Sequence, residues 1–199
     1  MDPTVVDPQT PDWLKQQLGN EPPVAVLSIA RLADQELLGR AGFALTSPAF
    51  DNGGELDPSF TAHEEDAVAP PLEWSAPPQE AVELALIVED ADAPDAPCHW
   101  LVWGLPPQRA KLLEGEAPPR TGKNAQGNSE WLLPRLNPDD KQHRYVFQLF
   151  ASDAPIDLRP GASRNDVVAA LEGRVVAAAL LTGTFAIPAD DADWDEDED

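Results

Sequence analysis

Residues 83–103 read ELALIVEDADAPDAPCHWLVW: an apolar run, an acidic turn with two prolines, and a second apolar run. The first run, Leu84–Val88, is short, unbroken and rich in branched side chains, which is typical of a strand buried on both faces. Asp90 and Asp92 follow it, and His99 begins the second run. A buried strand that ends in carboxylates and is followed by a histidine can line a pocket. Asp and Pro are also ordinary turn residues, so a solvated turn between two strands stays open as an alternative.

A second stretch, residues 142–150, reads QHRYVFQLF and predicts a strand with alternating apolar positions. Together the two stretches resemble the phosphatidylethanolamine-binding proteins, also called Raf kinase inhibitor-like proteins, in their bacterial branch. The family signature Asp-Pro-Asp-x-Pro followed by His-Trp occurs here as Asp90–Pro94 with His99-Trp100. The family's His-Arg-Tyr occurs as His143–Tyr145, and its Pro-Pro-Leu-x-Trp occurs as Pro70–Trp74.

The resemblance extends in order from about Phe43 to about Phe185. It implies a mainly β fold, a Greek-key β-sandwich with two or three short peripheral helices. The residues themselves favour the same class, because several short apolar runs alternate with Pro and Gly clusters. Further strands are expected at Val24–Ile29, Ala41–Thr46 and Thr182–Phe185. A helix is expected after an N-cap at Ser163, with Asp166 at its third position and Gly173 dividing it into two pieces.

The chain of 199 residues is long enough for one domain with a substantial core, expected over residues 24–189. Residues 1–23 form a proline-rich extension. A short helix is expected in it, with Asp12 as N-cap and Gly19 at its end. Its apolar side chains would dock it on the body or on a partner: Trp13, Leu14 and Leu18. Residues 190–199 are almost all acidic, and a disordered tail is expected there.

The net charge of −23 restricts the partners. Nucleic acids and anionic membranes both need basic surfaces, so neither is expected to bind. No apolar run approaches the ~20 residues that span a bilayer, and no signal peptide is expected. The one cysteine, Cys98, cannot form an internal disulfide, so a cytoplasmic location is expected. No cofactor is indicated, and a homodimer stays open.

The resemblance implies an anion-binding pocket at the strand ends. Carried over position by position, its lining is Asp90, Asp92, Pro94, His99, His143 and Tyr145, with Pro134 retained from the loop at the pocket mouth. Two imidazoles and a phenol can donate hydrogen bonds to a small oxyanion, and a nearby carboxylate can hold a histidine tautomer. The alternative is that each histidine is a core residue satisfied by the backbone. Arg144 should point to the opposite strand face and pair with an acid, and His63 is expected at the surface.

Two departures from the family pattern matter. Ala91 replaces the proline between the two aspartates, so the turn loses a restraint on φ. The long loop of residues 122–140 normally carries a glycine-rich segment before His-Arg-Tyr, whereas Trp131–Pro138 stands here. Glycines allow backbone N–H groups to approach a phosphate closely. Their absence predicts a pocket whose anion preference is changed or lost.

The leading functional hypothesis is a small-molecule or anion-binding protein, regulatory in the kinase-inhibitor-like sense by resemblance, without catalysis. The first alternative is a hydrolase that uses Asp90, His99 and His143 as acid and base. No Gly-x-Ser-x-Gly nucleophile motif is present, and the spacing gives no local metal motif. The second alternative is a protein-interaction role for the acidic surface or for the N-terminal helix.

Overall fold

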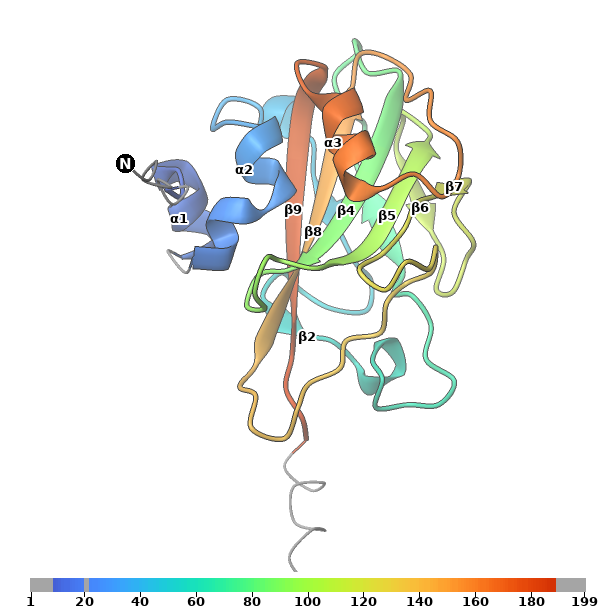
Figure 1. Cartoon of the computed structure of the whole chain (residues 1–199). Coiled ribbons are helices and arrows are strands. Elements are labelled where there is room, and N and C mark those ends of the chain that lie inside the picture. Colours follow the sequence, from blue (N-terminus) through green and yellow to red (C-terminus); the bar gives the residue numbers. More distant parts are fainter. Residues whose placement is uncertain (1–8, 20–21, 189–199) are drawn as a thin grey trace, which may run out of the picture.

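The computed structural model describes residues 9–19 and 22–188, and its central element is strand β4 (Glu83–Asp90). Every residue of β4 is buried, as its apolar run predicts. β4 pairs in antiparallel fashion with β5 (Cys98–Leu105) on one side and with β8 (His143–Ser152) on the other. The acidic turn therefore joins two neighbouring strands in the middle of a sheet (Figure 1).

Two sheets form a sandwich. The larger has the order β2-β9-β8-β4-β5-β7, with β2 (Gly54–Glu55), β7 (Arg120–Thr121) and the long closing strand β9 (Val175–Phe185). The smaller consists of β1 (Leu45–Thr46), β3 (Leu72–Trp74) and β6 (Ala110–Leu112) in the order β1-β3-β6.

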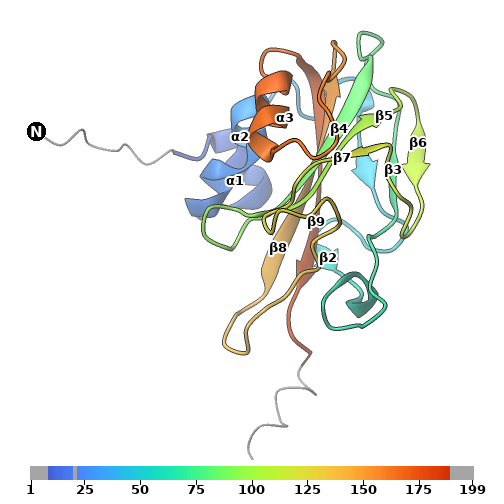
Figure 2. The same ribbon diagram turned by 45° about the vertical axis from the view of Figure 1, so that its right-hand side comes forward.

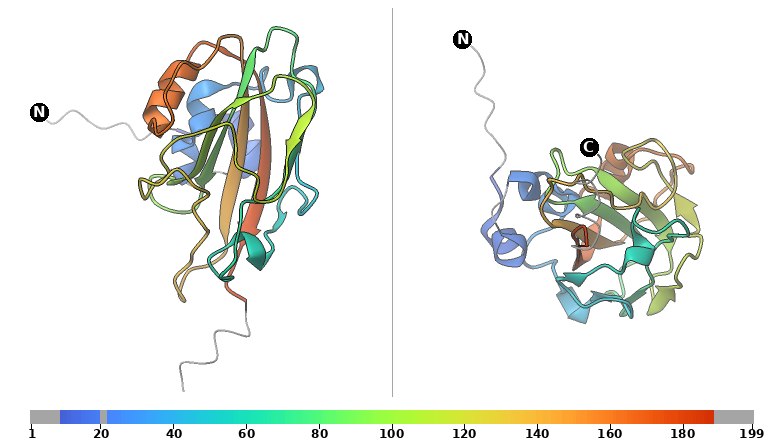
Figure 3. Two further views of the ribbon diagram at one scale, coloured as in Figure 1. Left: turned by 90° about the vertical axis from the view of Figure 1, so that its right-hand side faces the viewer. Right: turned by 90° about the horizontal axis from the view of Figure 1, so that it is seen from below.

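Short helices cover the face of the larger sheet that is turned away from the smaller one (Figures 2 and 3). They are α1 (Asp12–Leu18), the 3-10 helix η1 (Pro22–Val26), α2 (Ser28–Leu32) and α3 (Arg164–Leu171). Two further 3-10 helices, η2 (Arg40–Gly42) and η3 (Pro58–Phe60), lie in connections. The prediction of a mainly β sandwich with a few short peripheral helices is confirmed.

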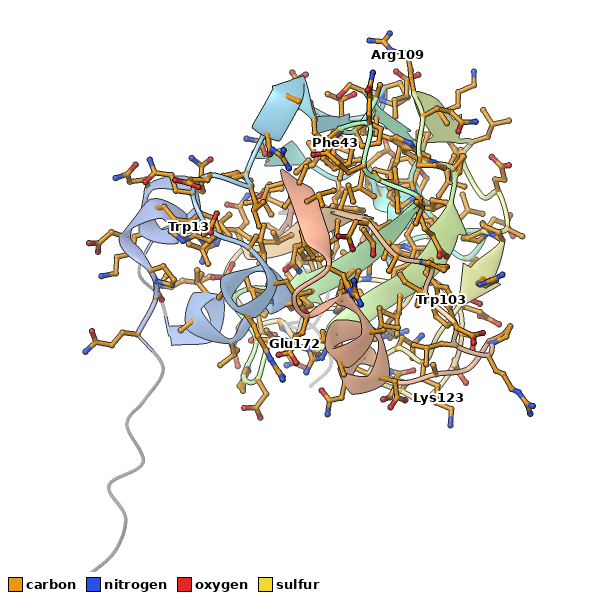
Figure 4. All side chains as sticks on the ribbon, turned by 90° about the horizontal axis from the view of Figure 1, so that it is seen from above. Trp13, Phe43, Trp103, Arg109, Lys123 and Glu172 are labelled. Atoms are coloured by element: carbon orange, nitrogen blue, oxygen red, sulfur yellow. The ribbon has the colours of Figure 1, made fainter. Side chains whose placement is uncertain are left out.

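Side chains of the larger sheet alternate between two hydrophobic layers. Leu86, Val88 and Phe147 belong to the layer between the sheets, whereas Ile87 and Val146 belong to the layer under the helices. Figure 4 shows side chains filling both layers, from Trp13 on α1 to Phe43 near the smaller sheet. The strand predicted within residues 142–150 is confirmed as part of β8, which is buried on both faces from Tyr145 onward.

The predicted strand at Val24–Ile29 is wrong, because η1 and α2 occupy this segment. A short apolar run fits either a helix or a strand. The backbone N–H groups of Ser28 and Ile29 donate to the side chains of Glu89 and Gln148, at 2.8 and 2.7 Å. These acceptors on the sheet satisfy the first turn of α2, and local sequence cannot reveal such distant partners.

The N-terminal helix is confirmed with one changed boundary. Pro11, not Asp12, is its N-cap, and the carbonyl of Pro11 accepts from two N–H groups of the first turn. Gly19 ends the helix as expected, with its N–H donating to the carbonyl of Lys15 at 2.8 Å. Leu14 and Leu18 are buried against the body.

Two other boundaries differ. Of Ala41–Thr46 only Leu45 and Thr46 form a strand, because a left-handed residue, Ala41 with φ of 56°, lies inside η2. The Ser163 cap of α3 is confirmed by reciprocal hydrogen bonds with Asp166. Gly173, with φ of +71°, does not divide a helix: the helix has already ended, and the chain turns into β9.

The acidic tail predicted for residues 190–199 lies outside the described residues. In the part of the chain that the structure describes, no helix has both the length and the apolar character needed to cross a bilayer.

Candidate functional site

Three of the predicted site residues meet where β4 ends and β8 begins. Asp90, the last residue of β4, is the cross-strand partner of Tyr145. His143 lies two residues before Tyr145, so both side chains occupy the same face of β8. That face is the one turned toward the smaller sheet, because Tyr145 belongs to the layer between the sheets. In Figure 1, β8 and β9 continue below the point where β4 ends and β5 begins.

A β-bulge brings His99 to the same place. Val88 pairs with Trp100, but the next residue of β4, Glu89, pairs with Cys98, so β5 has one extra residue at position 99. Such bulges redirect side chains. The ring centroid of His99 lies 5.0 Å from that of Tyr145 in an edge contact. Asp90, His99, His143 and Tyr145 therefore converge at one end of the layer between the sheets.

The protonation pattern of His143 follows from its partner. Its Nδ1 lies 2.8 Å from Oδ2 of Asp90. The other carboxylate oxygen, Oδ1, accepts from the backbone N–H groups of Asp92 and Ala93 at 2.9 and 3.1 Å. The turn thus holds the carboxylate, and the carboxylate fixes a proton on Nδ1. The ring atom that remains for a ligand is Nε2, which donates only when the imidazole is charged.

His99 has a different partner and a different role. Its Nδ1 lies 2.7 Å from the carbonyl oxygen of Leu132, and a carbonyl can only accept, so this nitrogen carries the proton. Burial lowers the pKa of His99 and outweighs the opposite effects of the Leu132 carbonyl and of Asp90. The neutral ring presents a lone pair at Nε2. The expectation that both imidazoles donate therefore needs a correction: neutral His99 accepts.

Tyr145 complements the two histidines. It is fully buried, and burial together with the charges of Asp90 and Asp92 raises the pKa of its hydroxyl group. The hydroxyl group therefore stays protonated at neutral pH and is able to donate.

Asp92 and Pro94 do not join this cluster. Asp92 accepts from Nη2 and Nε of Arg144 at 2.7 and 2.9 Å, on the helix side of the sheet. Burial raises the pKa of Asp92, but the hydrogen bonds and charge of Arg144 outweigh it, and the pKa is lowered overall. Pro94 is exposed in the turn. The prediction that Arg144 points to the opposite face and pairs with an acid is confirmed.

The loop that replaces the family's glycine-rich segment is folded into the core. Trp131 stacks on Phe147 with centroids 5.8 Å apart, and its Nε1 donates to the carbonyl of Phe60 at 2.9 Å. The next residue, Leu132, donates its N–H to the carbonyl of His99 at 2.7 Å. The loop thus holds His99 by both backbone and ring. The sequence analysis missed this role, although a tryptophan in a polar loop is a signal of anchoring.

A cavity of about 160 Å³ is lined by described residues outside the cluster. Phe185, the cross-strand partner of His143, lines it, as does Pro134 from the loop. His63 and Arg135, both exposed, stand at its rim, so the expected surface position of His63 is confirmed. Within residues 9–19 and 22–188, no group of three or more His, Cys, Asp or Glu side chains could hold a metal ion.

Comparisons with known proteins agree with this architecture. The family model described as phosphatidylethanolamine-binding protein matches residues 46–186. A UPF0098 protein of Methanothermobacter thermautotrophicus is 38% identical over 149 residues, which cover 71% of this chain and 97% of the relative. The solved structure of a putative phosphatidylethanolamine-binding protein homologue from Chlamydia trachomatis has a TM-score of 0.69 at 31% identity, covering 73% of this chain and 98% of that one. The structure of Escherichia coli YbcL, described as a new member of the mammalian PEBP family, has a TM-score of 0.67 at 25% identity. The match covers 74% of this chain and 100% of that one.

Proposed function

Because the chain belongs to the phosphatidylethanolamine-binding protein family, we propose that it binds a small phosphorylated anion at the cluster of Asp90, His99, His143 and Tyr145. The observation that carries this proposal is the pairing of His143 with Asp90 at 2.8 Å at one end of a buried layer. A cavity of about 160 Å³ is lined by Phe185, the cross-strand partner of His143. Such a volume suits an inorganic anion or a small head group, since drug-sized ligands need ~300 Å³ or more.

The cluster contains both hydrogen-bond donors and a hydrogen-bond acceptor for the anion. His143, when it carries both protons, donates from Nε2 with the strength of a charge-assisted bond. Tyr145 donates from its hydroxyl group. Neutral His99 accepts at Nε2, and its natural complement is an anion that keeps a proton. Asp90 orients His143 and makes no bond to the anion.

This arrangement favours phosphate monoanion or a protonated phosphomonoester over sulfate. Sulfate has the same shape and no proton at neutral pH, so it could not donate a hydrogen bond to Nε2 of His99. One such hydrogen bond contributes ~0.5–1.5 kcal/mol, roughly two- to tenfold in affinity.

Calorimetric titration with inorganic phosphate, phosphoethanolamine and sulfate tests the proposal. His143→Gln should weaken phosphate binding at least tenfold, because it removes the imidazole that Asp90 orients toward the anion. Lys111→Gln, which removes an exposed positive charge on the smaller sheet, is the matched control and should bind as the natural chain does. Equal affinity in His143→Gln would show that the cluster is not the site. If His63→Gln lost phosphate affinity and His143→Gln did not, the anion would instead bind near His63 at the rim of the cavity.

A hydrolase is the second candidate, because the Asp90–His143 pair is the arrangement that holds a general base. His99 bonds to a carbonyl instead of a carboxylate, so the site contains one such pair and not two. Turnover of a panel of esters and phosphoesters, lost in His143→Gln, would favour this candidate over simple binding.

A further inference from the structure

Along β4 and β8, residues that form the cluster are next in sequence to residues that bind the N-terminal helices. On β4, Asp90 faces the layer between the sheets, and its neighbour Glu89 faces the helices. On β8, His143 faces the cluster, and its neighbour Arg144 faces the helices. Residues 9–19 and 22–32, which contain α1, η1 and α2, are here called the N-terminal cover. They precede the family match, which begins at residue 46.

Arg144 joins the cover to the acidic turn. Its guanidinium binds both carboxylate oxygens of Asp92, and its Nη1 donates to the carbonyl of Leu18, the last residue of α1. Its backbone N–H donates to Asp92 at 2.7 Å, and its carbonyl accepts from Ala91 at 2.8 Å. The end of α1 and the turn that carries Asp90 therefore share one arginine.

Glu89 joins the cover to the end of β4. This carboxylate is fully buried and accepts from the N–H and hydroxyl groups of Ser28 at 2.8 and 2.7 Å. It also accepts from Gln148 at 2.6 Å and from Arg164 of α3 at 3.0 Å. If the cover moved away, Glu89 would lose two of these donors while still buried at the sheet, which is costly for a charged group.

Apolar packing adds to these two polar attachments. The cover contributes side chains that are at most 8% exposed to the layer under the helices: Leu14, Leu18, Val24, Leu27, Ile29 and Leu32. The helices that carry these side chains lie on the reverse face of the strands that carry the cluster (Figures 1 and 2).

We propose that the N-terminal cover positions the anion site, with Arg144 as the positioning residue that connects the docked cover to the Asp90–Asp92 turn and so to His143. This inference rests on the proposed function, because it concerns the same site. The docked cover holds Arg144, Arg144 holds Asp92, and the backbone of Asp92 and Ala93 holds Asp90 against His143. Coupling between binding equilibria is reciprocal, so an anion that favours the ordered turn also favours the docked cover.

Two variants of the full chain test the proposal. The double variant Leu14→Ala/Leu18→Ala removes buried side chains of α1 and weakens the docking of this helix. Gln17→Ala, at an exposed position on α1, is the control for the double variant. Arg144→Lys keeps the charge but cannot bind Asp92 and the Leu18 carbonyl at once. The first readout is the affinity for inorganic phosphate, which we expect to fall roughly tenfold in the first two variants and not in the control. The second is amide hydrogen exchange in α1 of the natural chain, which phosphate should slow.

A third readout needs no ligand. The Nδ1 proton of His143 is held by Asp90, and its NMR resonance should broaden through exchange with water when the cover is loosened. If the natural chain binds no phosphate, the proposed function fails, and this resonance decides the positioning role alone. A resonance unchanged in both Leu14→Ala/Leu18→Ala and Arg144→Lys, or changed equally in Gln17→Ala, overturns the inference. Phosphate affinity equal in all variants overturns it as well.

Discussion

His99 is buried with a neutral ring, and this makes the stability of the protein depend on pH. Burial lowers the pKa of His99 from 6.5 in the folded chain, so the unfolded chain binds more protons just below that value. The free energy of unfolding should therefore fall as the pH decreases below about 6.5, by at most ~1.4 kcal/mol per pH unit.

Urea unfolding between pH 5 and 7 measures this slope. In His99→Gln the slope should be flatter, whatever the effect of the substitution on packing. Gln17→Ala, which changes an exposed residue without a titratable group, should keep the slope of the natural chain. A slope equal in all three proteins would contradict the protonation state argued for His99.

Cys98 gives a second pH dependence at the alkaline end. Burial, followed by the charge of Glu89, raises the pKa of the Cys98 thiol from 9.0 to about 12. Above pH 9 the unfolded chain loses a proton that the folded chain keeps, so the free energy of unfolding should decrease as the pH rises from 9 toward 12. Between pH 9 and 10, Cys98→Ala should be less sensitive to pH than the natural chain.

At the scale of elements, the loop carrying Trp131 is part of the core. Trp131→Ala would remove a side chain that is only 8% exposed and that stacks on Phe147. The ring centroids of Trp131 and Trp100 are 5.8 Å apart. Large aromatic truncations in cores cost ~3–5 kcal/mol. Urea unfolding followed by circular dichroism should show a loss of this size. Trp13→Ala, at a half-buried position on α1, should lose clearly less, and equal losses would mean that the loop is only loosely attached.

The elements that sequence predicts well are those with strong local patterns. The unbroken run Leu84–Val88 fits a strand with two buried faces, and Ser163 with Asp166 fits a helix start. Val24–Ile29 failed because its backbone partners, Glu89 and Gln148, lie far away in the sequence. The bulge at His99 was equally invisible, since it depends on the register between two strands.

At the scale of the whole molecule, the order of the motifs predicted the sandwich and brought four of the candidate site residues to one end of it. The features of the site that could not be predicted depend on how the two sheets and the helices pack on one another. Asp90 and Asp92 are two residues apart in the same family signature, yet Asp90 bonds to His143 and Asp92 bonds to Arg144. The anchoring of the N-terminal cover through Arg144 requires both faces of β8 to be known.

The acidic tail should be dispensable for folding. Residues 190–199 carry eight acidic groups and one large apolar side chain, Trp194. Ordering each residue costs ~1–2 kcal/mol of backbone entropy, which so little apolar surface cannot offset. Truncation after Ala189 should leave the melting temperature nearly unchanged in calorimetry. A decrease of many degrees would show that Trp194 docks on the body.

The same truncation should change anion binding, because charge acts over the whole molecule. Without its eight acidic residues the net charge of −23 becomes −15, so the chain remains strongly negative but repels an anion less. The Debye length is ~30 Å at 10 mM salt and ~8 Å at 150 mM, so salt screens the long-range repulsion more than the short contact with His143. Phosphate affinity of the full chain, which we expect to be weak because the loop lacks glycines near the site, should rise between 10 and 150 mM potassium chloride. The truncated chain should bind phosphate more tightly at low salt and gain less from added salt. Affinity that falls steeply with salt in both proteins would mean that a local basic surface, and not the buried cluster, attracts the anion.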